Sequence, residues 1–137
     1  MAYLGQISTK EHHGLQLILQ LAKTYGTKKS VSLRAIGGRE RVSAKYLEQL
    51  IVPFRKAKWL QSYRGREGGY RMVKDPKTIS LKDVMALMGG DRELVSCLGN
   101  KRCLVEKFCP SKKAWQTIQD ALQNALESIH LSDLLST

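Results

Sequence analysis

The N-terminal part of the chain carries apolar residues at the spacing of helices. Residues 15–22 are apolar on nearly every side, which is typical of a helix that other elements surround. Ser32 is a favourable N-cap for a short second helix over residues 33–39, because a serine hydroxyl accepts a hydrogen bond from a first-turn amide. Gly37 and Gly38 weaken that helix, since glycine loses more backbone entropy in a helix than other residues do.

A third helix and a hairpin follow. Ser43 is placed to cap the helix, in which apolar residues recur every three or four positions and polar residues fill the opposite face. Pro53 lies inside that pattern and removes a backbone hydrogen bond, so we expect a kink or an irregular turn there. Residues 59–63 and 70–73 are typical of two strands, and the glycine-rich segment 65–69 between them predicts a β-hairpin with a flexible tip.

The last part of the chain predicts two helices separated by a loop. Ser80 is the expected N-cap of a fourth helix that ends at Gly89 and Gly90. Segment 97–109 has no clear periodicity, so we interpret it as a loop. From Ser111 onward we expect a long helix that carries an apolar stripe. The stripe is formed by Trp115, Ile118, Leu122, Ala125 and Ile129.

The charge of the chain restricts its possible partners. Lys and Arg number 23 against 12 Asp and Glu, which gives a formal net charge of +11 and favours a polyanionic partner. Nucleic acid is the first candidate, and the alternatives are an anionic membrane surface, an acidic protein partner or a solvated basic surface. No segment approaches the roughly 18 apolar residues of a membrane span. The N-terminus lacks a secretory signal, so we expect a cytoplasmic protein without a membrane partner.

Three short helices followed by a basic hairpin are the order of a winged helix-turn-helix, whose third helix enters the major groove of double-stranded DNA. Polar residues near the start of that helix would reach phosphates and base edges. These are Ser43, Lys45, Tyr46 and Gln49, with Arg34 and Arg39 for the DNA backbone. At the hairpin tip, Arg64 and Arg66 suit the narrow minor groove, and the missing side chains of Gly65, Gly68 and Gly69 permit close approach. A solvated hairpin turn is the alternative.

The elements predict a mainly α-helical fold with one small β-hairpin. We divide the chain into a winged helix-turn-helix DNA-binding domain over residues 1–90, a cysteine-containing sensor loop over 91–110, and a dimerisation helix with the C-terminal end over 111–137. So small a domain cannot wholly cover the apolar stripe of the long helix, whereas a two-fold partner would cover it and form a homodimer. Packing of the stripe on its own domain is the alternative.

The cysteines form a cluster of their own. Cys97, Cys103 and Cys109 are separated by five residues each, and an odd number of cysteines does not suit a disulfide framework. Thiolates are soft ligands for iron–sulfur clusters or zinc, and a loop can wrap three of them around one centre. Spacing alone leaves a cluster, a zinc site and unliganded thiols open.

Several segments together resemble the Rrf2 family of bacterial regulators over nearly the whole chain. They are Ile7-Ser8-Thr9-Lys10, Val31-Ser32-Leu33, the run from Ser43 to Leu50, Arg64-Gly65 through Gly68-Gly69-Tyr70, and the end from Leu131 to Leu135. The resemblance implies a DNA-binding transcription regulator in which residues 46–50 lie in the recognition helix. It further implies that Glu48 can read bases, that Arg64 inserts into the minor groove and that the long C-terminal helix forms the dimer.

Two residues depart from the pattern of this family. Arg41 occupies the corner between the second and third helices, where the family often has glycine. Lys58 replaces a glycine that commonly ends the third helix. Left-handed backbone at either position would carry strain, because a side chain disfavours that conformation.

The resemblance also bears on the cysteines, because their spacing is similar to that of the Rrf2 branches that bind an iron–sulfur cluster, [2Fe-2S] or [4Fe-4S]. Some branches place a histidine three residues after the last cysteine, but here that residue is Lys112, a poor ligand. Other branches take the fourth ligand from the first helix of the partner subunit. That position corresponds to His12, with Glu11 or His13 as substitutes.

We therefore expect a sequence-specific regulator whose operator binding is switched by an iron–sulfur cluster. The alternative is an Rrf2-type regulator without a cluster, switched by thiol oxidation, zinc, a small ligand or a partner protein. Basic residues near the cysteines would activate their thiols for such a switch. We do not expect an enzyme, because no motif positions a histidine base, an orienting carboxylate or an oxyanion loop around a cysteine nucleophile.

Overall fold

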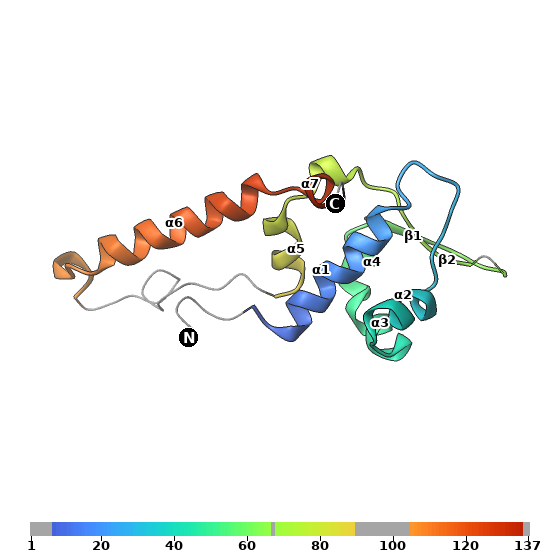
Figure 1. Cartoon of the computed structure of the whole chain (residues 1–137). Helices are drawn as coiled ribbons and strands as arrows, with labels where there is room; N and C mark the ends of the chain where they lie inside the picture. The colour runs from blue at the N-terminus through green and yellow to red at the C-terminus, as the bar shows by residue number, and fades with distance from the viewer. Residues whose placement is uncertain (1–6, 67, 90–104, 136–137) are drawn as a thin grey trace.

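The computed structural model describes residues 7–66, 68–89 and 105–135 (Figure 1). The elements in chain order are α1 (Thr9–Ala22), α2 (Leu33–Glu40), α3 (Ala44–Leu50), α4 (Val52–Lys56), β1 (Leu60–Tyr63), β2 (Gly69–Met72), η1 (Pro76–Thr78), α5 (Leu81–Leu87), η3 (Glu106–Phe108), α6 (Lys112–Ser128) and α7 (Leu131–Leu134). The predicted class, mainly helical with one small antiparallel hairpin, is confirmed.

Serine caps set the starts of the first three helices. The hydroxyl oxygens of Ser32 and Ser43 each accept a hydrogen bond of 3.1 Å from a backbone amide of the following turn, as predicted. Helix α1 begins earlier than the apolar segment 15–22, because Ser8 caps it and accepts from the Glu11 amide at 3.1 Å. The first turns of α1 therefore include the two neighbouring histidines.

Helix α1 runs through the core, as its apolar sequence predicted. Leu17, Ile18 and Leu21 are fully buried. They pack with residues of α2, α3, α4, the hairpin and α5 in one hydrophobic cluster. Leu131 of α7 belongs to the same cluster, so the end of the described chain returns to this core. We call the unit formed by α1 to α5 together with α7 the head.

The expected irregularity at Pro53 is present. The third predicted helix is divided at Ile51 into α3 and α4, and the proline lies in the first turn of α4, where its missing amide costs little. Helical bonding nevertheless continues across the division, because Ile51 N donates to Leu47 O at 2.9 Å and Arg55 N donates to Ile51 O at 3.0 Å. The two helices therefore act as one nearly continuous rod.

Strands β1 and β2 pair in antiparallel register, with Leu60 opposite Met72 and Tyr63 opposite Gly69. We call this hairpin the wing, and Figure 1 shows that it projects from the head. Val31 pairs with β2 as an isolated antiparallel β-bridge, through two backbone hydrogen bonds with Tyr70 of 3.0 and 2.8 Å. A side chain at Gly69 would overlap the backbone of Val31, so glycine is needed where the α1–α2 loop crosses the wing.

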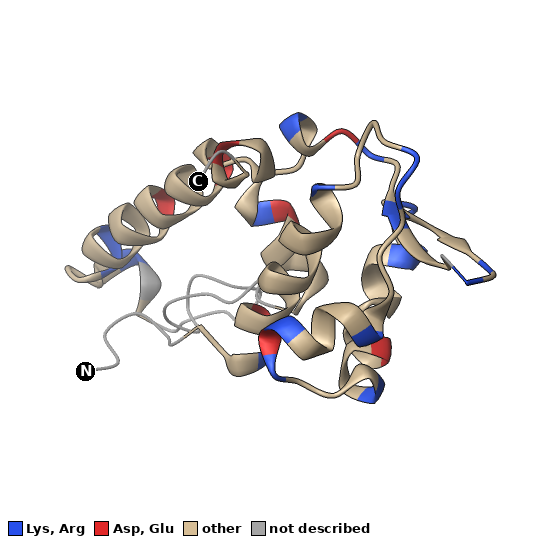
Figure 2. Cartoon of the chain, turned by 45° about the vertical axis from the view of Figure 1, so that its right-hand side comes forward, with Lys and Arg blue, Asp and Glu red and all other residues tan. Residues whose placement is uncertain are grey.

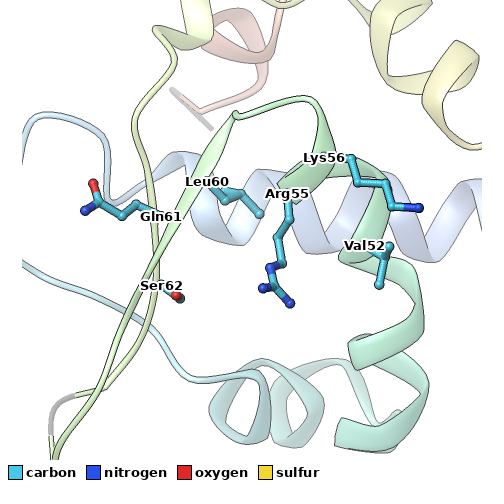
Figure 3. Close-up of a pocket in the computed structure, with 6 residues that line it drawn as sticks. All are labelled: Val52, Arg55, Lys56, Leu60, Gln61 and Ser62. Carbon is cyan, nitrogen blue, oxygen red and sulfur yellow. The ribbon is translucent and has the colours of Figure 1, made fainter.

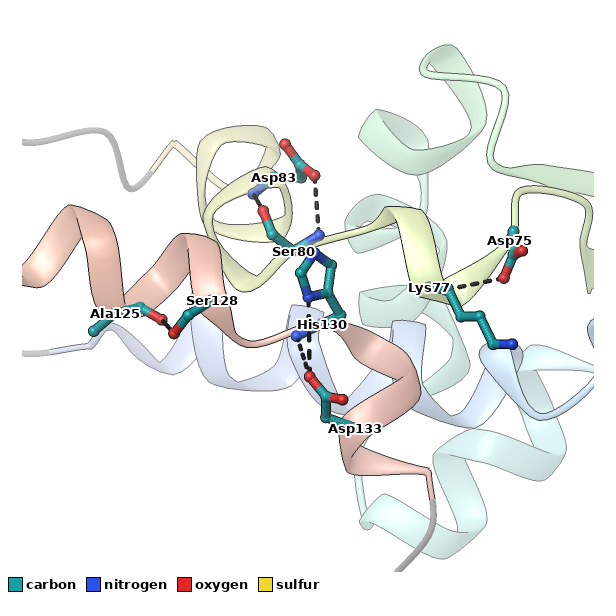
Figure 4. A network of polar contacts seen from close by, with 8 residues as sticks. All are labelled: Asp75, Lys77, Ser80, Asp83, Ala125, Ser128, His130 and Asp133. Carbon is teal, nitrogen blue, oxygen red and sulfur yellow. Dashed lines mark hydrogen bonds and ion pairs between the residues drawn. The ribbon is translucent and has the colours of Figure 1, made fainter.

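A backbone bridge holds α6 to the head. Leu81 N donates to Ile129 O at 2.8 Å, and Leu131 N donates to Ile79 O at 2.9 Å. Figure 4 shows that Ser80 and His130 lie beside each other in this bridge. The backbone amide of Ser80 donates to the Asp83 carboxylate of α5, and the backbone amide of His130 donates to the Asp133 carboxylate of α7. The starts of α5 and α7 are thereby fixed together.

Candidate nucleic-acid interface

Helices α2 and α3 form the predicted helix-turn-helix. The corner residue Arg41 adopts the left-handed conformation, with φ 56° and ψ 42°, and its amide bonds to the Gly37 carbonyl. Lys58 is likewise left-handed, with φ 63°. Both departures from the family pattern therefore place a side chain on backbone that favours glycine, as the sequence suggested.

Arg41→Gly is expected to raise the free energy of unfolding by about 0.5–1 kcal/mol. Left-handed backbone costs a residue with a side chain about 1–2 kcal/mol, and the greater freedom of glycine in the unfolded chain offsets about 0.4–1 kcal/mol of the gain. Urea denaturation measures the change. Arg39→Gly, inside α2, is the control and should instead lower stability by about 1 kcal/mol. Equal destabilisation by both would contradict a strained corner.

The exposed face of α3 carries three of the predicted DNA-contacting residues. Lys45, Glu48 and Gln49 are exposed, while Leu47 and Leu50 on the other face are buried. Ser43 is exposed, and its hydroxyl oxygen caps the helix. The first two turns of α3 thus present a mixed polar surface of the kind that reads base edges.

Tyr46 faces α1 as well as solvent. It is half-buried, and its hydroxyl lies 3.3 Å from His13 Nδ1. The two rings also meet edge to face, with centroids 5.5 Å apart. Sequence reasoning missed this link between the histidine pair and the recognition helix, because the two residues lie far apart in the chain.

The predicted DNA-contacting residues of α2, and most of those at the wing tip, are exposed. They are Arg34, Arg39, Arg64, Gly65 and Arg66. Figure 2 shows basic residues on the tip of the wing. Gly68 and Gly69 are half-buried instead, and Gly68 N donates to Gly65 O at 2.9 Å. Their close approach to DNA stays a prediction, and Gly68 also closes the turn at the tip of the wing.

Arg71 positions further positive charge at the wing. Its Nε donates to the Lys29 carbonyl at 2.9 Å, and a terminal nitrogen donates to the Lys28 carbonyl. Its guanidinium also lies 4.3 Å from the centroid of the Tyr63 ring, a cation–π contact. The loop before α2 is thereby held beside the wing, a role that periodicity in the sequence did not reveal.

The described part of the cysteine segment is a short 3-10 turn followed by Cys109, and Cys97 and Cys103 lie outside the described residues. The Sγ of Cys109 lies 3.2 Å from the Ser111 hydroxyl. That hydroxyl, helped by the backbone amides of Ser111 and Lys112, lowers the pKa of the Cys109 thiol. Among the residues that the structure describes, no three His, Cys, Asp or Glu side chains gather as a metal site.

The three candidates for a fourth ligand differ in their surroundings. Glu11 is 6 % exposed and accepts a 2.9 Å hydrogen bond from the Ser8 hydroxyl, so it belongs to the start of α1. His13 contacts Tyr46. His12 is exposed, with its ring centroid 5.6 Å from that of His13. Of the three residues, His12 is the most exposed.

Helix α6 leaves the head as an arm (Figure 1). None of its residues is buried, and Trp115 and Leu122 are 39 % and 37 % exposed. The predicted stripe continues through Ile118 and Ala125, but Ile129 lies beyond the helix, which ends at Ser128. The structure therefore corrects the length of the helix by one residue, because Ile129 turns into the bridge with Leu81.

Comparison with known proteins identifies the family. The profile of the Rrf2 family, described as iron-dependent transcriptional regulators, matches residues 7–137. The chain belongs to the Rrf2 family. It is 35 % identical over 132 residues to the helix-turn-helix regulator CymR of Bacillus subtilis, covering 96 % of this chain and 90 % of that protein.

Other members of the Rrf2 family agree with this assignment. The regulator IscR of Vibrio vulnificus is 30 % identical over 131 residues, covering 96 % of this chain and 77 % of that protein. The solved structure of B. subtilis CymR, described as the global cysteine regulator, superposes with a TM-score of 0.79 at 34 % identity, covering 96 % of each chain. The present protein is therefore a DNA-binding transcription regulator of the Rrf2 family.

Within the described residues, every helix is too short or too polar to cross a lipid bilayer.

Proposed function

We propose that this Rrf2 regulator is a cytoplasmic homodimer that reads an operator with α3 in the major groove and the wing tip in the adjacent minor groove. The observation that carries this proposal is the capped helix α3 with Lys45, Glu48 and Gln49 exposed together. Arg64 and Arg66 supply charge at the wing, where a narrow minor groove attracts arginine. Arg34 and Arg39 of α2 are exposed for phosphates.

The homodimer is supported by the exposed stripe of α6. A helix with a strongly apolar face and no buried residue needs a partner, since water contact with that face is unfavourable. A second copy related by a two-fold axis presents the same stripe, so each covers the other. The same symmetry would place two copies of α3 about one DNA turn apart.

Operator binding by this dimer is switched by an iron–sulfur cluster held by Cys97, Cys103, Cys109 and His12. The donor set fits, because thiolates and imidazole both ligate such clusters. At Cys109 the lowered pKa of the thiol favours the thiolate form that ligation needs. A bound cluster supplies sensitivity to iron, oxidants or nitric oxide, and His12 would come from the α1 of the partner copy.

Helix α1 connects such a ligand to the recognition helix. His13 follows His12 directly, and the 3.3 Å contact of its Nδ1 with the Tyr46 hydroxyl joins α1 to α3. A change in the position of α1 would alter the support of α3, and we propose that it shifts the DNA-reading surface between two arrangements. This link is the proposed route from sensing to operator affinity.

Anaerobic purification is expected to give a coloured protein with near-stoichiometric iron and acid-labile sulfide per dimer. His12→Ala should lower the iron content and change operator affinity, because a cluster ligand is lost. Lys10→Ala, on the same exposed first turn of α1, is the matched control and should keep both values. Unchanged iron and affinity in His12→Ala would show that His12 is not a ligand.

Colourless protein after attempted reconstitution would favour a second candidate, a regulator without a cluster. The lowered pKa of the Cys109 thiol supports this candidate, since a thiolate reacts readily with oxidants. The likeness to a protein described as a global cysteine regulator supports it as well. Thiol oxidation, zinc, a small ligand or a partner protein would then act on the same DNA-binding dimer.

A further inference from the structure

A cleft separates the rod of α3 and α4 from the first strand of the wing. Its volume is about 550 Å³, and it is lined by Val52, Arg55, Lys56, Leu60, Gln61 and Ser62. Figure 3 shows Arg55 pointing from α4 into the space between the helices and the hairpin, and Ser62 on the hairpin side of the same space. None of these residues was among the DNA contacts expected from the sequence.

The lining of the cleft suits a sugar–phosphate chain. Arg55 and Lys56 are exposed and bring two positive charges, while Gln61 and Ser62 add neutral hydrogen-bond donors. None of the described residues that line the cleft is acidic. Val52 and Leu60 add apolar surface, against which a deoxyribose can pack. The guanidinium of Arg55 also lies 5.8 Å from the Tyr70 ring centroid, which orients it toward the wing.

The position of the cleft follows from the continuity of α3 and α4. The exposed residues Lys45, Glu48 and Gln49 are followed at helical steps by Val52 and Arg55, because backbone bonding continues across Ile51. The cleft therefore lies at the end of the exposed face of α3, with the wing as its other wall. In a duplex, one sugar–phosphate backbone separates a major groove from the adjacent minor groove.

We infer that this cleft binds the DNA backbone that runs between the groove read by α3 and the groove entered by the wing. The inference rests on the proposed placement of α3 and the wing on DNA, since only that placement brings a DNA strand across the cleft. Arg55 and Lys56 contact its phosphates, and Gln61 and Ser62 help to hold them. The cleft sets the register of the head on the operator without reading bases.

The test compares wild type with an Arg55→Gln/Lys56→Gln variant, which keeps side-chain length and removes both charges. Binding is measured from 50 to 200 mM salt with a duplex selected by the wild type from a random pool. Each lost phosphate contact reduces the slope of log K against log salt by about 0.9, so we expect a total reduction of about 1.8. The ratio of variant to wild-type Kd should fall about twelvefold across that range.

A Lys23→Gln/Lys77→Gln variant removes the same charge from exposed residues that line a different pocket, beside η1 and α7. It should keep the wild-type slope. Preference for the selected over a random duplex should persist in the cleft variant, because phosphate contacts weaken both alike. Thermal denaturation checks that both variants fold.

Methylphosphonates placed singly along the selected duplex locate the contact. Neutral linkages in the DNA backbone between the two grooves should lower the affinity of the wild type for the duplex and leave the affinity of the cleft variant unchanged. A cleft variant with the wild-type slope would overturn the inference and leave the proposed reading of DNA intact. Lost discrimination with an unchanged slope would also overturn it, since the residues would then read bases. Failure of the wild type to select any duplex would overturn the proposed function and this inference together.

Discussion

Leu122→Asp is expected to convert the proposed dimer into a monomer and to abolish tight operator binding. The Leu122 side chain is 37 % exposed on the stripe of α6 that we propose as the interface. A two-fold axis would bury two new carboxylates there without partners, at about 3 kcal/mol for each copy. Together these costs weaken dimerisation by about four orders of magnitude. Operator affinity falls with it, because two linked heads bind far more tightly than one.

Sedimentation analysis across a range of protein concentrations measures this change. Asn124→Asp adds the same charge to the same helix, on the face opposite the stripe, and should leave the dimer intact. A dimer that persists in Leu122→Asp would show that another surface joins the two copies. The exposed stripe would then need a different partner.

Much of the head could be predicted because its signals are local. Ser32, Ser43 and Ser80 cap helices where the sequence placed them, since a cap needs only a hydroxyl and the amides of the next turn. The bounds of both strands differ from the expected ones by at most one residue. Alternating apolar and polar residues and a glycine-rich turn fix the pairing of strands that are close together in the chain. The strain at Arg41 was expected because the family that the sequence resembles often has glycine at this corner.

Features that join distant segments could not be predicted in this way. The contact of His13 with Tyr46 depends on how α1 crosses α3, and no periodicity within either helix encodes it. The cleft pairs α4 with β1 across the turn at Lys58. The return of Leu131 to the core depends on the bridge between Leu81 and Ile129. The same bridge draws Ile129, the last residue of the predicted stripe, out of α6. Each of these features is a property of packing.

Gly37 and Gly38 illustrate the same difference within one helix. Sequence reasoning treated them alike, as residues that weaken α2. In the structure Gly37 is buried against the corner of the helix-turn-helix, whereas Gly38 is exposed. A Cβ atom at Gly37 would lie 2.5 Å from the Val42 carbonyl oxygen, whereas one at Gly38 would have no described atom within 4 Å apart from its chain neighbours and the nearby backbone of its own helix. The first glycine is therefore required for the approach of α2 to α3.

Gly37→Ala is accordingly expected to lower the free energy of unfolding by about 3 kcal/mol, the upper part of the range for overpacking. The obstructing atom is backbone, and it cannot rotate away as a side chain would. The Gly37 carbonyl also accepts the amides of Arg41 and Val42, so a displaced helix loses the bonds that close the corner. Operator discrimination should fall too, because α3 begins two residues after Val42 and moves with it.

Gly38→Ala is the matched control and should have the opposite sign, with a gain of about 0.5–1 kcal/mol from the better helix propensity of alanine. Urea denaturation of both variants, together with their preference for the selected over a random duplex, gives the comparison. If both substitutions stabilise the protein, α2 and α3 do not approach as closely as described. If both destabilise it equally, the cost comes from α2 as a whole, and the corner formed by Gly37 and Val42 does not control the position of the recognition helix.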